Sequence, residues 1–86
     1  MKFKFNHLDD MKEFATYLSR ELEEMGYKDK SKMVNEFSYN SYTTSSEYLG
    51  EFRILLEDLK KENIFNNKVK TEVDFAIKVI NKAFGN

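Results

Sequence analysis

The chain has 86 residues, of which 41% are hydrophobic and thirteen are aromatic, enough for one small core, and this composition excludes whole-chain disorder. Fourteen basic and fifteen acidic residues give a formal net charge of −1, which argues against generic nucleic-acid binding. The absence of cysteine excludes disulfides and thiolate zinc sites, and the single histidine, His7, leaves little for a metal site or a catalytic triad.

The chain contains no proline and only three glycines, so it favours long helices. No apolar run approaches the roughly 20 residues of a membrane span, and the first residues lack the apolar segment of a signal peptide. We therefore expect one cytoplasmic all-α domain over residues 1–86. Its expected fold is a small antiparallel helical bundle of three long helices and one short one, with a short extended N-terminal arm.

The arm is predicted from the alternation of lysine and phenylalanine over residues 2–5. The only other alternating run covers residues 37–42, so one alternative is that residues 1–5 and 37–42 pair as two short strands. The interpretation we favour is an arm that lays Phe3 and Phe5 over the end of the bundle.

The first helix is expected over about residues 7–25, with Asn6 as its cap. Gly26 lies where a left-handed residue ends a helix, and Tyr27 is placed to pack back on Leu22 in a Schellman motif. The apolar stripe of this helix consists of Leu8, Met11, Phe14, Ala15, Leu18, Leu22 and Met25.

The second helix is the short one, expected over about residues 32–41. It would follow a charged loop at residues 27–30, with Ser31 as its N-cap. Its clear apolar positions are Met33, Val34 and Phe37, which would also suit an irregular loop.

The third helix, expected over residues 45–61, is predicted to be the central and most buried one. Thr44 and Glu47 form a capping box in front of it, and Asn63 can end it. Gly50 in its interior suggests a close helix crossing. Its apolar face consists of Tyr48, Leu49, Phe52, Leu55, Leu56 and Leu59.

The last helix is expected over about residues 67–84, beginning after Asn66 and ending at Gly85. Its apolar stripe consists of Val69, Val73, Ala76, Ile77, Ile80, Ala83 and Phe84. Its lysines at positions 68, 70, 78 and 82 outnumber two acids, and with Lys60 and Lys61 they could form a basic corner that binds phosphate. The alternative is an ordinary solvated lysine face.

The first helix carries the most informative surface, because residues 9–24 hold six acids and two bases, a balance of −4. Spacings of three, four, four and three residues place five of its residues in one stripe opposite the apolar face: Asp10, Glu13, Tyr17, Glu21 and Glu24. We call this set the acidic stripe. It is either a solvated face or a docking surface for a basic protein, since charge complementarity speeds encounter and fixes orientation.

Three tyrosines gather around the second connection, among serine, threonine and asparagine: Tyr39, Tyr42 and Tyr48. Tyrosine is enriched in binding hot spots because it buries a large rigid ring and keeps a hydroxyl for hydrogen bonding. Tyr39 and Tyr42 are therefore candidate partner-binding residues, although Tyr39 and Tyr48 could instead close the core. No pre-placed nucleophile accompanies His7, so we expect no enzyme, cofactor or metal site.

The expected cysteine-free helical bundle with an acidic face resembles the small immunity proteins that bacteria pair with toxins. Thr44-Ser45-Ser46-Glu47, before the third helix, resembles a helix start in the immunity proteins of nuclease colicins. The chain has neither the proline nor the Tyr-Tyr pair of the segment that follows the second helix in that family, so no family binding residue is carried over. The broader resemblance implies stoichiometric neutralisation of a toxin without catalysis.

The leading hypothesis is thus an immunity or antitoxin-like inhibitor of a basic toxin or effector domain, with no membrane or nucleic-acid partner. One alternative is a nucleic-acid-associated regulator that uses the lysines of the last helix. Another is a homo-oligomeric structural bundle.

Overall fold

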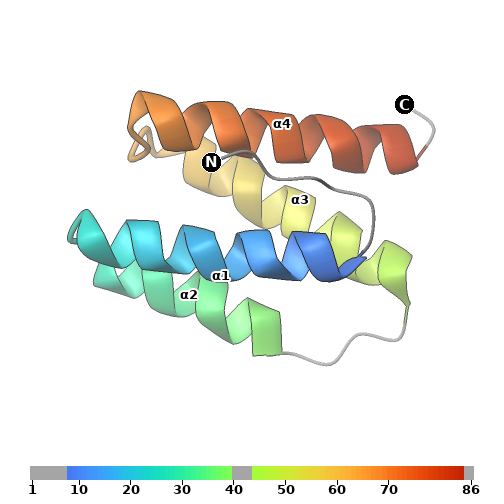
Figure 1. Ribbon diagram of the computed structural model, residues 1–86, viewed down its shortest axis with the longest axis horizontal. Helices are drawn as coiled ribbons and strands as arrows, with labels where there is room; N and C mark the ends of the chain where they lie inside the picture. The colour runs from blue at the N-terminus through green and yellow to red at the C-terminus, as the bar shows by residue number, and fades with distance from the viewer. Residues whose placement is uncertain (1–7, 40–43, 85–86) are drawn as a thin grey trace. The chain divides into compact units, whose positions relative to one another are not determined.

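A computed structural model of the chain describes residues 8–39 and 44–84. It contains the helices α1 (Leu8–Glu24), α2 (Lys28–Tyr39), α3 (Ser45–Lys61) and α4 (Asn67–Ala83), and no strand occurs in these two ranges (Figure 1). The all-α prediction is confirmed for them, as is the prediction of three long helices and one short one. None of these helices is both long and apolar enough to cross a membrane.

The chain divides into two compact units, Met1–Ser41 and Tyr42–Asn86. Within each unit the two helices form an antiparallel hairpin: α1 packs on α2, and α3 packs on α4 (Figure 1). The predicted extended arm at residues 1–5 and the predicted cap Asn6 lie outside the described residues. That the chain forms one domain stays a prediction.

The end of α1 has the predicted Schellman geometry. Gly26 is in the left-handed region with φ at 92°, which glycine adopts without the Cβ clash of other residues. The Tyr27 amide donates to the Leu22 carbonyl at 2.9 Å, and the Gly26 amide donates to the Glu23 carbonyl at 3.0 Å. These bonds satisfy two carbonyls that the helix end would otherwise leave unpaired, so the chain reverses within three residues.

The beginning of α2 differs from the prediction, because the helix starts at Lys28 and not at residue 32. The carbonyl of Tyr27 already accepts the amide of Ser31 at 2.9 Å, so the expected loop is the first turn of the helix. Ser31 is therefore not an N-cap but a buried residue, 5% exposed. Residues 37–39 belong to α2, so the strand alternative is wrong for them, and residues 40–42 lie outside the described part.

The bounds and caps of the second hairpin follow the sequence prediction, but α3 is not the most buried helix as predicted, since among the described residues it buries four and α1 buries six. Thr44 caps α3 by accepting the Glu47 amide at 3.1 Å, and Asn66 caps α4 by accepting the Val69 amide at 2.9 Å. Asn63, with φ at 54°, ends α3 as predicted. Each helix buries four positions at spacings of three and four residues: Tyr48, Phe52, Leu56 and Leu59 in α3, and Val69, Val73, Ala76 and Ile80 in α4.

Two polar contacts mark the register between α3 and α4. The Arg53 guanidinium donates to the Asn81 side chain at 2.8 Å, and Lys60 forms an ion pair with Asp74. A Cβ at Gly50 would lie 3.9 Å from the Phe84 ring, an ordinary van der Waals distance. Gly50 thus lies beside an α4 side chain, but no backbone approach excludes a side chain there.

Candidate protein-binding surface

The acidic stripe follows one side of α1. Because this helix is unbroken from Leu8 to Glu24, its five positions follow one another at one-turn intervals. Glu13 and Glu24 are exposed, whereas Asp10, Tyr17 and Glu21 are half-buried, so the stripe borders the apolar face and does not lie opposite to it as predicted. The stripe therefore offers both accessible carboxylates and partly packed side chains to a partner.

Tyr17, in the middle of the stripe, is held by the core beneath it. Its ring centroid is 6.0 Å from that of Phe14, with an angle of 31° between the ring planes, and Phe14 is fully buried. A half-buried ring packed on a fixed neighbour has little rotamer freedom left to lose when a partner covers it. Among carboxylates, such a ring can serve as a pre-ordered anchor.

The stripe lies on the side of α1 turned away from α2. The direction of α2 is marked by Ser19, whose hydroxyl bonds to Ser31 of α2. Tyr17 lies two residues earlier and so points about 160° away around the helix. The helix of its own hairpin therefore does not cover the stripe.

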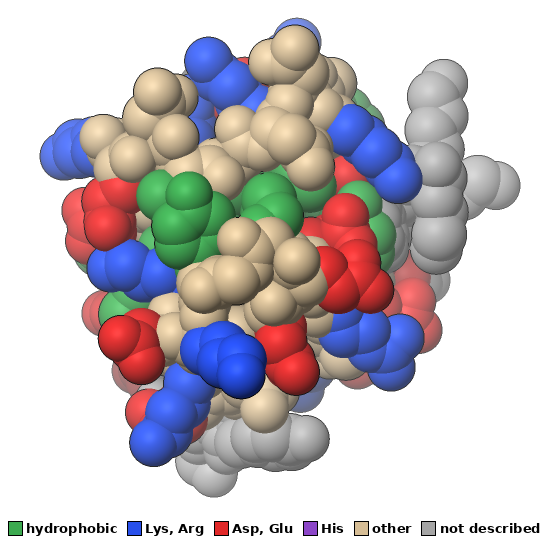
Figure 2. Space-filling view, turned by 90° about the vertical axis from the view of Figure 1, so that its left-hand side faces the viewer, with side chains coloured by type: hydrophobic (Ala, Val, Ile, Leu, Met, Phe, Trp, Pro, Cys, Tyr) green, Lys and Arg blue, Asp and Glu red, His purple; other side chains and the backbone are tan. Residues whose placement is uncertain are grey.

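The acidic excess is confined to the first hairpin. Residues 8–39 contain eight acids and five bases, whereas residues 44–84 contain seven of each. On the side of the molecule drawn in Figure 2, acidic and basic side chains are interspersed. The acidic stripe is thus a local feature and not part of a uniformly acidic surface.

The predicted tyrosine cluster is described only in part. Tyr48 is 2% exposed and packs on Phe52, with the ring centroids 5.9 Å apart, so it belongs to the core. Tyr39 is the last residue of α2, but its side chain lies outside the described part, as does all of Tyr42. The role of Tyr39 and Tyr42 in partner binding stays a prediction.

One lysine of the predicted basic corner, Lys60, forms a salt bridge with Asp74, so its charge is partly neutralised. The four lysines of α4 and Lys61 are exposed. Two open depressions on the described surface are lined by charged residues and do not resemble the apolar clefts that hold small molecules. Arg20, Glu23, Glu24 and Lys28 line one of them, and Glu57, Lys60 and Lys61 line the other.

Two exposed apolar side chains in the second hairpin were not singled out from the sequence. Ile54 is 53% exposed and Phe75 is 49% exposed. Each lies two residues after a buried position, Phe52 and Val73, and so falls outside the apolar stripe of its helix. An apolar residue out of phase with its stripe is the sequence signal that would have identified both.

Comparison with protein-family models, curated proteins and solved structures gave no match to this chain. Within the described residues, no three histidine, cysteine or acidic side chains are grouped so that they could hold a metal ion.

Proposed function

We propose that this protein is a small non-catalytic binding protein, an immunity or antitoxin-like inhibitor that neutralises a basic toxin or effector domain through the acidic stripe. The observation that carries the proposal is a half-buried tyrosine, packed on Phe14 and flanked along one helix face by carboxylates. An anchored aromatic ring between carboxylates along one helix face combines a hot-spot residue with electrostatic steering.

The acidic excess of α1 supports the choice of a basic partner. It works against the stability of the isolated helix, since carboxylates one turn apart repel each other. A cationic partner would relieve that repulsion on binding, so the same side chains would raise both the association rate and the affinity. The resemblance to immunity proteins supports the same partner class and a site of action in the cytoplasm.

We also propose that the two hairpins pack together as one antiparallel bundle. Units of about forty residues rarely bury enough apolar surface to be stable without disulfides, metals or association, and this chain has no cysteine. We expect a single calorimetric unfolding transition whose calorimetric and van't Hoff enthalpies agree. Two separate transitions would contradict the bundle.

The binding proposal is tested by affinity capture from the source organism with the wild type and with the double variant Glu13→Lys/Glu21→Lys. We expect the wild type to capture a basic protein that the variant does not, and to neutralise its toxicity at a ratio of one to one. The matched control is Glu23→Lys/Glu36→Lys, which makes the same change in charge at exposed positions of the same hairpin.

If the control variant loses the partner as well, net charge and not the acidic stripe determines binding. If both variants keep the partner, the stripe is only a solvated face, and Tyr39 and Tyr42 become the next candidates. Recovery of nucleic acid without any protein, with salt-dependent retention on a nucleic-acid column, would favour the regulator that uses the α4 lysines.

A further inference from the structure

Five exposed residues form one line along the side of α4 that does not face α3. They follow one another at alternating intervals of three and four residues, which keeps them on one helix face: Lys68, Thr71, Phe75, Lys78 and Lys82. We call this set the basic stripe. From position 68 to position 82 it extends about 21 Å along the helix axis.

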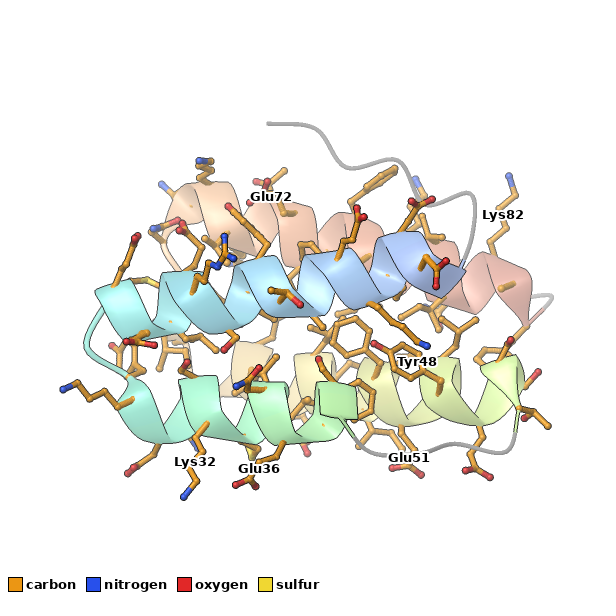
Figure 3. The ribbon with its side chains drawn as sticks, turned by 60° about the horizontal axis from the view of Figure 1, so that its bottom comes forward. Lys32, Glu36, Tyr48, Glu51, Glu72 and Lys82 are labelled. Carbon is orange, nitrogen blue, oxygen red and sulfur yellow. The ribbon has the colours of Figure 1, made fainter. Side chains whose placement is uncertain are left out.

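The contacts with α3 leave the basic stripe uncovered. Asp74 and Asn81 bond to side chains of α3 and so mark the side of α4 that faces this helix. Phe75 lies about 100° from Asp74 around the helix and about 120° from Asn81. Figure 3 shows Lys82 pointing away from α3. A ligand could therefore reach the whole stripe without moving the helix that packs on α4.

The lysines of the basic stripe have no acidic partner in the described part of the chain. No ion pair among the described residues includes Lys68, Lys78 or Lys82. Of the two acids in α4, Asp74 is already paired with a lysine of α3, and Glu72 is half-buried. A ligand with several negative charges would therefore gain from all three cations.

Phe75 lies among these lysines with 49% of its surface exposed. Lys68 and Lys82 are displaced from it by only about 20° to either side around the helix, and Lys78 is about 4.5 Å further along the axis. A line of cations with an exposed aromatic ring is the combination that binds single strands of nucleic acid, because the cations attract the phosphates and the ring stacks on a base. The lysines alone would suit any polyanion, and the ring favours one that carries bases.

We propose that the basic stripe binds single-stranded nucleic acid, with Phe75 stacked on one base and the three lysines on the neighbouring phosphates. A duplex suits the stripe less well, because its bases are already stacked on each other and paired. The net charge of −1 gives little long-range attraction, so we expect a Kd on the order of 0.1 mM at physiological salt. This site is separate from the acidic stripe on α1 and goes beyond the inhibitor function.

The experiment is a titration of a fluorescein-labelled oligothymidylate with the protein, read by fluorescence anisotropy at several salt concentrations. Three neutralised phosphates predict that the logarithm of the association constant falls with the logarithm of the salt concentration with a slope of about −2. Lys78→Gln/Lys82→Gln removes two of the three cations, so it should weaken binding at least about tenfold at about 50 mM salt and change the slope to about −0.7. The matched control Lys61→Gln/Lys70→Gln removes two exposed lysines outside the stripe and should keep the slope of about −2.

Phe75→Ala tests the stacking contact. It should weaken binding about tenfold and leave the salt slope unchanged, because the three charges remain. The chain has no tryptophan, so Phe75→Trp places a single indole in the stripe, and its fluorescence should be quenched when the oligothymidylate binds. Circular dichroism shows whether each variant is folded.

Wild type that does not bind the oligothymidylate at about 50 mM salt overturns the proposal. So does a Phe75→Ala variant that binds as tightly as the wild type, or a duplex of the same length that binds as tightly as the single strand. If poly-L-glutamate competes as well as unlabelled oligothymidylate at equal charge, the stripe suits an acidic protein instead. The variant Glu13→Lys/Glu21→Lys keeps the basic stripe and should bind the oligothymidylate at least as tightly as the wild type, so the inhibitor proposal and this one fail separately.

Discussion

Ser19 and Ser31 exchange hydrogen bonds across the contact between α1 and α2. The Ser31 hydroxyl donates to the Ser19 carbonyl at 2.7 Å, the Ser19 hydroxyl donates to the Ser31 carbonyl at 3.1 Å, and the two hydroxyl oxygens are 3.0 Å apart. Both residues are buried, at 8% and 5% exposure. Two small side chains thus let the helices approach closely and satisfy each other's polar atoms there.

Replacing either serine with alanine should destabilise the protein. Each loss removes one hydrogen-bonding hydroxyl and leaves the partner serine with fewer of its bonds, so we expect a drop of about 1–2 kcal/mol in the free energy of unfolding. The double variant should lose less than the sum of the two single losses, because the two side chains act on each other. Urea unfolding of all four proteins measures this coupling.

Ser38→Ala is the matched control for this cycle. Its hydroxyl donates to the Val34 carbonyl at 3.2 Å within the same helix, so it ties no two elements together. We expect a change within about 0.5 kcal/mol. Strictly additive losses at Ser19 and Ser31 would show that the two hydroxyls contribute independently.

The serine contact is the reason that the sequence alone predicts the wrong start for the second helix. A serine beside charged residues is a good N-cap by local chemistry, and the sequence does not reveal that position 31 packs against α1. Local signals succeeded where the partner is a neighbour in the chain, as at Gly26, Thr44 and Asn66, whose bonds span five residues or fewer. The contact between positions 19 and 31 depends on tertiary packing.

The left-handed conformation of Gly26 predicts a loss of stability on substitution. In Gly26→Ala the new Cβ would meet no atom within 4 Å, so the cost is that of a φ of 92° in the backbone itself. We expect about 1–2 kcal/mol of destabilisation by urea unfolding. Gly26→Asn should lose less, because asparagine tolerates this region better, and equal losses for both residues would contradict the backbone explanation.

Gly50 should respond in the opposite direction. It lies inside α3, where glycine costs about 0.5–1 kcal/mol relative to alanine, and an added Cβ would have its nearest neighbour, the Phe84 ring, at 3.9 Å. Gly50→Ala should therefore raise the free energy of unfolding by about that amount. A lower value would mean that the helix needs a closer approach at this position than the distance indicates.

The candidate site was only partly predictable. Periodicity placed the acidic stripe on one face of α1, because such a face depends only on the helix being continuous. The packing of Tyr17 on Phe14 is a contact that spacing allows but does not require. The register between α3 and α4, in which Arg53 lies beside Asn81 and Lys60 beside Asp74, follows from tertiary packing that no local signal in either helix contains.

The cap of α3 gives the last prediction. Thr44 has an extended backbone, with φ at −136° and ψ at 160°, and its hydroxyl accepts the Glu47 amide. Thr44→Ala removes that acceptor, and we expect a loss of about 1 kcal/mol in the free energy of unfolding, whereas Thr44→Asp should keep the bond and add a charge that the helix dipole favours. Ser46→Ala, at an exposed first-turn position, is the control and should change stability by less than about 0.5 kcal/mol. Equal losses at positions 44 and 46 would mean that the cap bond does not stabilise the helix. A loss only at position 44 would show that the cap bond stabilises the start of α3.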